Sequence, residues 1–177
     1  MIRSDPVKEK ELTIEEEVAQ LLQKYQLSIT TAESCTGGLI AGTLVNVSGI
    51  SSQFNEGYIT YSNEAKERLL GVSHATLETY GAVSEQTAEE MAAGARCAAH
   101  ADMSIVSTGI AGPDGGTKEK PVGLVYLGCA SSNGVTVERH IFSGSRQEVR
   151  MSAVHAALTL VKKVIESNEK AISKEQI

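Results

Sequence analysis

Three side chains that can act as nucleophiles stand side by side in the stretch TAESCTGG, residues 31–38. They are Ser34, Cys35 and Thr36, and two glycines, Gly37 and Gly38, follow them. A serine at the start of a helix has the free N–H groups of the first turn within reach, and these can stabilise an oxyanion or hold a phosphate. Ser and Thr are also the preferred N-caps of helices, and the spacing alone favours that plainer interpretation. The stretch therefore predicts either a catalytic serine or a helix cap.

The stretch TYSNEAK, residues 60–66, holds a tyrosine and a lysine that could serve such a serine. Lys66 falls in the first turn of an expected helix, where the helix dipole disfavours a cation and lowers the pKa of the amine toward that of a usable base. Tyr61 could relay a proton or orient the lysine. A Ser-Lys or Ser-Tyr-Lys set activates a hydroxyl without histidine or metal. The alternative is a solvated lysine paired with a glutamate on a helix surface.

Two further segments could bind a ligand. STGIAGPDGG, residues 107–116, places Thr108 at a strand end, and its glycines, among them Gly109 and Gly112, would allow a ring or phosphate to approach the backbone. It has the order of neither a P-loop nor a dinucleotide fingerprint, and an ordinary loop is the alternative. Arg146 and Arg150 stand at the entrance to the last helix, where they suit a phosphate or carboxylate, or pair with surface acids.

The cysteines and histidines indicate no metal site. Three cysteines, in three separate segments and without CxxC spacing, are expected as reduced thiols. The four histidines show no HxH or HExxH spacing, and His155 is expected to pack near the apolar face of the last helix. Cys35 would need a histidine partner as a nucleophile, and none occurs in the glycine-rich segments. Ser34 is therefore the better candidate.

The elements that must position these residues alternate between strand and helix patterns. Strands are predicted over 27–32, 56–62 and 102–110, each followed by one of the polar segments, and a Ser-Asn-Gly turn predicts a hairpin of two more strands after residue 123. Helices are predicted over 13–25 with a Thr13–Glu16 capping box, over 37–47, in three pieces between 62 and 101, and over 146–166. We predict an α/β fold, a three-layer sandwich with a mixed, mostly parallel sheet flanked by helices. If the three strands run parallel, the polar segments meet at one edge.

Length and composition limit the domain organisation and the classes of function that this chain can have. A chain of 177 residues fits one domain, expected over residues 13–167, with flexible tails at 1–12 and 168–177. The net charge of −6 disfavours a broad surface for nucleic acid or an anionic membrane. No apolar run approaches the roughly 20 residues of a membrane span, and the N-terminus lacks a signal peptide's apolar core. We expect a soluble, cytoplasmic protein that forms a homo-oligomer.

Five motifs in the same order closely resemble the CinA C-terminal domain family, whose characterised members are nicotinamide-nucleotide amidases, also called NMN deamidases. They are TAESCTGG, GYITYSNEAK, LETYGAVSE, STGIAGPDGGTKEKPVG and FSGSR, and the resemblance covers residues 13–166. The family includes stand-alone enzymes and domains fused to another domain, and the length leads us to expect the stand-alone form.

The resemblance implies hydrolysis of the carboxamide of nicotinamide mononucleotide to nicotinic acid mononucleotide and ammonia, a step in NAD recycling, without cofactor or metal. Ser34 would be the nucleophile and Lys66, helped by Tyr61, its base. Amides at the start of the 37–47 helix would stabilise the oxyanion. Substrate binding would involve seven further residues: Thr36, Gly37, Gly38, Thr108, Gly109, Gly112 and Arg146. The alternative is a non-catalytic domain that binds a nucleotide or partner in a competence or DNA-damage pathway.

Overall fold

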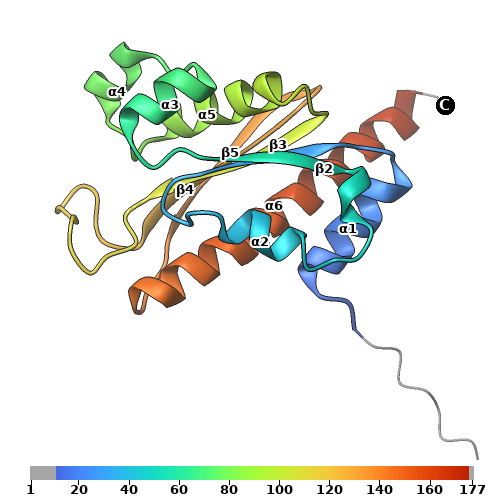
Figure 1. Cartoon of the computed structure of the whole chain (residues 1–177), viewed down its shortest axis with the longest axis horizontal. Coiled ribbons are helices and arrows are strands. Elements are labelled where there is room, and N and C mark those ends of the chain that lie inside the picture. Colours follow the sequence, from blue (N-terminus) through green and yellow to red (C-terminus); the bar gives the residue numbers. More distant parts are fainter. Residues whose placement is uncertain (1–10, 176–177) are drawn as a thin grey trace, which may run out of the picture.

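The computed structural model describes residues 11–175, with side chains as far as residue 170. One sheet of five strands runs through it in the order β2-β1-β3-β4-β5 (Figure 1). Two of the neighbouring pairs are parallel and two are antiparallel. The α/β fold and the mixed sheet are confirmed, but the prediction of a mostly parallel sheet is not supported, because β4 and β5 together contribute as many antiparallel pairs as the other strands contribute parallel ones.

The three strands on one side of the sheet run parallel and carry the polar segments at their carboxyl ends. They are β1 (Ile29–Glu33), β2 (Phe54–Ile59) and β3 (Met103–Gly109), and β1 lies between the other two. β1 is buried along its whole length, and all but the last residue of β3 are buried. The chain therefore leaves the sheet three times at the same edge, as the sequence predicts.

The predicted hairpin completes the sheet. β4 (Leu124–Ser131) and β5 (Gly134–Ile141) pair antiparallel around a turn at Asn133. β4 also pairs antiparallel with β3, so that the long loop between them, residues 110–123, lies at the same edge as the ends of the parallel strands.

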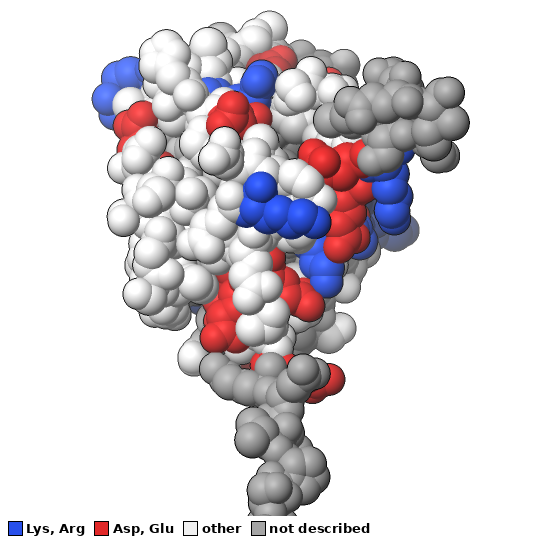
Figure 2. Space-filling view, turned by 90° about the vertical axis from the view of Figure 1, so that its right-hand side faces the viewer, with Lys and Arg blue, Asp and Glu red and all other residues white. Residues whose placement is uncertain are grey.

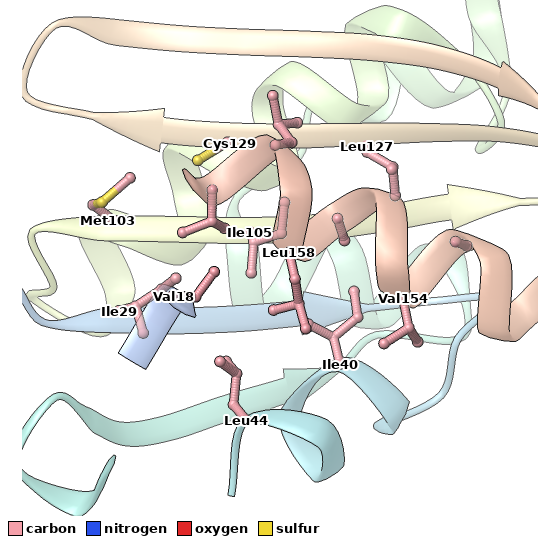
Figure 3. Packing of buried hydrophobic residues seen from close by; sticks show 14 of the residues in the cluster. Val18, Ile29, Ile40, Leu44, Met103, Ile105, Leu127, Cys129, Val154 and Leu158 are labelled. Carbon is pink, nitrogen blue, oxygen red and sulfur yellow. The ribbon is translucent and has the colours of Figure 1, made fainter. Parts of the chain in front are cut away.

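Helices α1 (Ile14–Lys24), α2 (Leu39–Leu44) and α6 (Arg146–Glu175) cover one face of the sheet. Figure 3 shows Ile40 and Leu44 of α2 pointing into the same apolar cluster as Val154 and Leu158 of α6. Removing this apolar surface from water stabilises the fold. α2 begins two residues after the predicted start at residue 37, because the two glycines form a turn, and it ends at Leu44 where the prediction ended at residue 47. α6 extends beyond its predicted end at residue 166.

Helices α3 (Asn63–Leu70), α4 (His74–Tyr80) and α5 (Glu85–Ala98) cover the other face and form a second apolar cluster with the sheet (Figure 1). α5 lies close to α3 because Gly94 has no side chain; a Cβ there would collide with the carbonyl group of Leu70. With helices on both faces, the predicted three layers are present. Ser62 caps α3 and Ser84 caps α5, because each side chain accepts a hydrogen bond from a backbone N–H in the first turn of its helix.

The surface carries acidic and basic groups side by side. On the face in Figure 2, Lys and Arg side chains lie next to Asp and Glu side chains among neutral residues. Lys162 pairs with Glu17 at 2.9 Å, and Lys163 pairs with Glu138 at 3.1 Å. Within residues 11–175, no helix is both long and apolar enough to cross a membrane.

Candidate active site

Ser34 is the first residue after β1 and lies at the edge where the parallel strands end. Its backbone N–H donates to the carbonyl oxygen of Ser107 in β3 at 3.0 Å, which fixes the start of the turn to the neighbouring strand. Thr60, the first residue after β2, is tied in the same way, because its N–H donates to the Glu33 carbonyl at 2.9 Å. The sheet itself therefore holds the serine and the segment that leads to Lys66 next to each other.

Lys66 reaches Ser34 from helix α3. Its Nζ donates to Ser34 Oγ at 3.2 Å and to the carbonyl oxygen of Thr60 at 2.9 Å. The side chain is buried, with 1% of its surface exposed, and no acidic side chain among the described residues forms an ion pair with it. Burial disfavours the ammonium form and lowers the pKa of Lys66. The lowered pKa agrees with the sequence prediction, although the cause is burial, where the sequence suggested the helix dipole.

Tyr61 and Arg146 form a separate contact with each other. Tyr61 is exposed, and its hydroxyl accepts a hydrogen bond from Arg146 Nη2 at 3.0 Å. Arg146 Nη1 also donates to the carbonyl oxygen of Gly112 at 2.8 Å. No hydrogen bond among residues 11–170 joins Tyr61 to Lys66 or Ser34. Tyr61 therefore contacts Arg146 and not the Ser34–Lys66 pair. Arg146 in turn connects the segments that follow β2 and β3.

A buried carboxylate, that of Glu33, holds the start of α2. Its side chain has no exposed surface and accepts four hydrogen bonds. The donors are Thr36 Oγ1 at 2.6 Å, Gly38 N at 3.0 Å, Ile40 N at 3.0 Å and Ala41 N at 2.8 Å. This role of Glu33 was not predicted. An acidic residue directly after the predicted strand 27–32 and a few positions before the predicted 37–47 helix is the signal that could have indicated it.

This arrangement argues against the interpretation of residues 31–38 as a side-chain helix cap, and it corrects the prediction that amides at the start of the helix stabilise the oxyanion. Thr36 is not the cap of α2, because its hydroxyl lies 2.6 Å from Ser107 Oγ and donates to Glu33, and the N-cap position is Gly38. The amides at the start of the helix are not free to stabilise an oxyanion, because three of them already donate to Glu33. Gly37 and Gly38 have φ values of +60° and +97°, so they are needed for the sharp turn between β1 and α2.

Arg150 in α6 supports the same turn from the helix side. Its Nε donates to the carbonyl oxygen of Cys35 at 3.1 Å, and its Nη2 donates to that of Thr36 at 2.8 Å. The guanidinium thus binds two successive main-chain carbonyls. Of the two arginines considered from sequence for a phosphate, Arg150 holds the protein's own backbone and Arg146 lies more exposed beside Tyr61.

Cys35 is placed as a core residue. It is buried within the apolar cluster beneath the sheet, and burial raises the pKa of its thiol to about 11. A thiol with this pKa is almost entirely protonated near pH 7, and the thiolate is the nucleophilic form. The Thr36 hydroxyl is fully buried against Glu33 and Ser107. Of the three candidate nucleophiles in the turn, Ser34 is therefore the one whose hydroxyl contacts the Lys66 amine.

The residues predicted in the loop after β3 have structural partners. The Thr108 hydroxyl is buried and donates to the carbonyl oxygen of Ala82 at 2.7 Å. A Cβ on Gly109 would lie 2.6 Å from the Leu124 carbonyl oxygen, and one on Gly112 would lie 2.5 Å from Val122 Cγ1. The close contacts with Leu124 and Val122 therefore explain why both positions are glycine.

Metal-ligating groups do not gather at this edge. No group of three or more His, Cys, Asp or Glu side chains within residues 11–170 has the arrangement of a metal site. His155, expected to pack against the apolar face of the last helix, is exposed instead. The arrangement consists of a serine, a buried lysine, an exposed Tyr–Arg pair and backbone amides, which suits acyl transfer through a serine ester.

Comparisons with known proteins agree with this architecture. The family model described as "CinA C-terminal domain" matches residues 11–165. A CinA-like protein of Kosmotoga olearia is 51% identical over 155 residues, which are 88% of this chain and 38% of that protein. The chain thus spans well under half the length of the curated relatives that it matches.

Solved structures of similar size show the same fold. The competence/damage inducible protein CihA of Agrobacterium tumefaciens is 42% identical with a TM-score of 0.81, covering 88% of this chain and 98% of that one. A competence-damaged protein (CinA) superfamily protein of Klebsiella pneumoniae is 33% identical with a TM-score of 0.84, covering 87% and 96%. The chain therefore belongs to the CinA C-terminal domain family.

Proposed function

We propose that this chain is an amidohydrolase that converts nicotinamide mononucleotide to nicotinic acid mononucleotide and ammonia. The observation that carries the proposal is the buried amine of Lys66, 3.2 Å from Ser34 Oγ, with its pKa lowered by burial. An amine without a carboxylate partner has little to hold it in the ammonium form, and its neutral form can accept the serine proton.

The reaction proceeds through an ester of Ser34. Neutral Lys66 takes the proton from Ser34 Oγ as that oxygen attacks the carboxamide carbon, and backbone amides of the turn stabilise the oxyanion. The C–N bond then breaks, and the Lys66 ammonium returns its proton to the departing nitrogen, which leaves as ammonia. Water attacks the ester with Lys66 again as the base, giving the carboxylic acid and free Ser34. The substrate's pyridinium withdraws electrons from the carboxamide and makes its carbon a better target.

Arg146 binds the nucleotide in this proposal. Its guanidinium is exposed and already oriented by Tyr61 Oη and the Gly112 carbonyl oxygen, so it can meet a phosphate or ribose with little loss of side-chain freedom. Tyr61 then acts through Arg146 as a substrate-binding residue, and Lys66 remains the base.

The experiment that tests the proposal uses chelator-treated protein and nicotinamide mononucleotide. Ammonia and nicotinic acid mononucleotide are measured separately, and we expect them to appear in equal amounts. Correctly folded protein that gives neither product overturns the proposal. If it nevertheless binds the nucleotide in a calorimetric titration, the domain is a non-catalytic nucleotide-binding module.

A further inference from the structure

The helix that follows the candidate nucleophile has no free amide at its start. In α2, the N–H groups of Gly38, Ile40 and Ala41 donate to the Glu33 carboxylate. The Leu39 N–H donates to the Thr36 carbonyl oxygen at 3.3 Å, and the Gly42 N–H donates to that of Gly38 at 2.8 Å. The first turn is therefore fully occupied by the protein itself.

Two backbone amides next to Ser34, those of Cys35 and Thr36, remain without a main-chain acceptor among the described residues. The N–H of Ser34 donates to Ser107, and that of Gly37 donates to the Ser34 carbonyl oxygen at 3.1 Å. Among the described residues, the Thr36 N–H donates to no other group, and the Cys35 N–H contacts only the thiol of its own side chain. They are the two amides that directly follow Ser34, and their own carbonyl oxygens are held by Arg150.

We propose that the Cys35 and Thr36 amides form the oxyanion hole, and that Glu33 is the positioning residue that fixes them by binding the start of α2 and the Thr36 hydroxyl. The inference rests on the proposed function, because it names the donors that the same reaction requires. Glu33 precedes Ser34 directly, so its carboxylate anchors both ends of the turn, residues 34–38. Arg150 on the carbonyl side and Glu33 on the helix side together hold the two peptide planes.

The charge of Glu33 fits this role. Four donors point at its two oxygens, which is the arrangement of an ionised carboxylate that only accepts. Hydrogen bonds to a charged group are stronger than neutral ones, and a dry site strengthens them further. A preorganised turn stabilises developing charge without rearranging during the reaction.

The sharpest test replaces single backbone amides by esters, which deletes one N–H donor and keeps every side chain. The Thr36 N–H is exchanged by incorporating the α-hydroxy analogue of threonine. The Gly42 N–H is exchanged in the same way as the matched control, because it donates to the Gly38 carbonyl oxygen within α2 and not to Glu33. Two rates are measured: kcat for nicotinamide mononucleotide, and the rate at which a fluorophosphonate modifies Ser34, read by mass spectrometry. The phosphoryl oxygen of that reagent needs the same donors as the oxyanion.

We expect the Thr36 ester to lower both rates about a hundredfold, because one oxyanion donor is worth about 10²–10³ in rate. The Gly42 ester should change them less than about fivefold. Equal effects of the two esters, or no effect at Thr36, would overturn the inference. If wild-type protein leaves the nucleotide intact, the proposed function fails, and the fluorophosphonate rates still decide the inference: slowing by the Thr36 ester alone supports it, and no modification of Ser34 overturns it.

Glu33 is tested by Glu33→Gln, with Glu90→Gln as its control. Glu90 also holds a helix start, because it accepts from Ser73 N at 2.7 Å and from Thr76 Oγ1 at 2.6 Å, but it lies outside the turn. We expect Glu33→Gln to lower kcat at least about tenfold with little change in KM, and Glu90→Gln to lower Tm without changing kcat. A Glu33→Gln protein that loses only Tm would show that the carboxylate is merely structural.

Discussion

Replacing Lys66 by methionine separates a catalytic base from a buried structural lysine. Methionine has a similar length, carries no charge and can lie in the same apolar surroundings. The substitution removes the two hydrogen bonds that Nζ donates, to Ser34 Oγ and to the Thr60 carbonyl oxygen. Everything else that positions Ser34 comes from other residues: the β1–β3 pairing, Glu33 and Arg150.

The expected effects on stability and on rate differ in size. Each lost hydrogen bond costs about 0.5–1.5 kcal/mol of unfolding free energy, and the variant no longer has to bury a group that is charged when unfolded. We therefore expect the stability at pH 7 to stay within about 2 kcal/mol of wild type. Loss of a general base lowers kcat by about 10²–10⁴, which corresponds to roughly 3–5 kcal/mol of activation free energy.

Ammonia release and thermal unfolding are measured on the same preparations. Lys162→Met is the control. Lys162 of α6 pairs with Glu17 of α1, so this substitution also removes a lysine amine but should leave kcat unchanged. The reasoning is refuted if folded Lys66→Met retains kcat within about threefold of wild type, since another group would then have to take the serine proton.

Three further outcomes follow from the same contacts. Arg146→Ala should raise KM for nicotinamide mononucleotide about tenfold or more and change kcat less; steady-state kinetics check this, and an unchanged KM contradicts it. Cys35, with its thiol pKa raised to about 11, should resist iodoacetamide at pH 7.5 while exposed Cys97 reacts, as peptide mass spectrometry would show. Because burial lowers the pKa of Lys66, the unfolded chain binds more protons between the folded pKa and about 10.5. Wild type should therefore gain stability relative to Lys66→Met as pH rises through that window, and parallel pH–stability curves would refute this.

The fold could be predicted from sequence where local signals agree with tertiary packing. The Thr13–Glu16 capping box, the caps Ser62 and Ser84, and the Asn133 turn all lie where local residue chemistry places them. The balance of parallel and antiparallel pairs could not be predicted, because strand order depends on contacts between segments far apart in the chain. The predicted start of α2 was wrong because two glycines with positive φ belong to the turn.

The site was predictable as far as strand ends could be identified. Ser34 and Lys66 meet because β1 and β2 are parallel neighbours, and the sequence indicated both strands. The role of Glu33 depends on a strand residue turning back to cap the next helix, and the role of Arg150 depends on how α6 lies under the turn. For Glu33 the one local signal is its place between a predicted strand and a predicted helix. The contact of Arg150 has no local signal that distinguishes it from an ordinary surface charge. Tyr61 was assigned to Lys66 by proximity in sequence, and its hydrogen bond is to Arg146, 85 residues away.

The rate of nicotinamide mononucleotide hydrolysis by Ser34→Ala, set against wild type, tests the central claim most directly. Ser34 Oγ forms the ester in this account, and removing that oxygen leaves the sheet, Glu33 and Lys66 in place. We predict a folded variant whose release of ammonia and nicotinic acid mononucleotide is slower by at least about a hundredfold. A Ser34→Ala protein that releases both products at the wild-type rate would contradict the account.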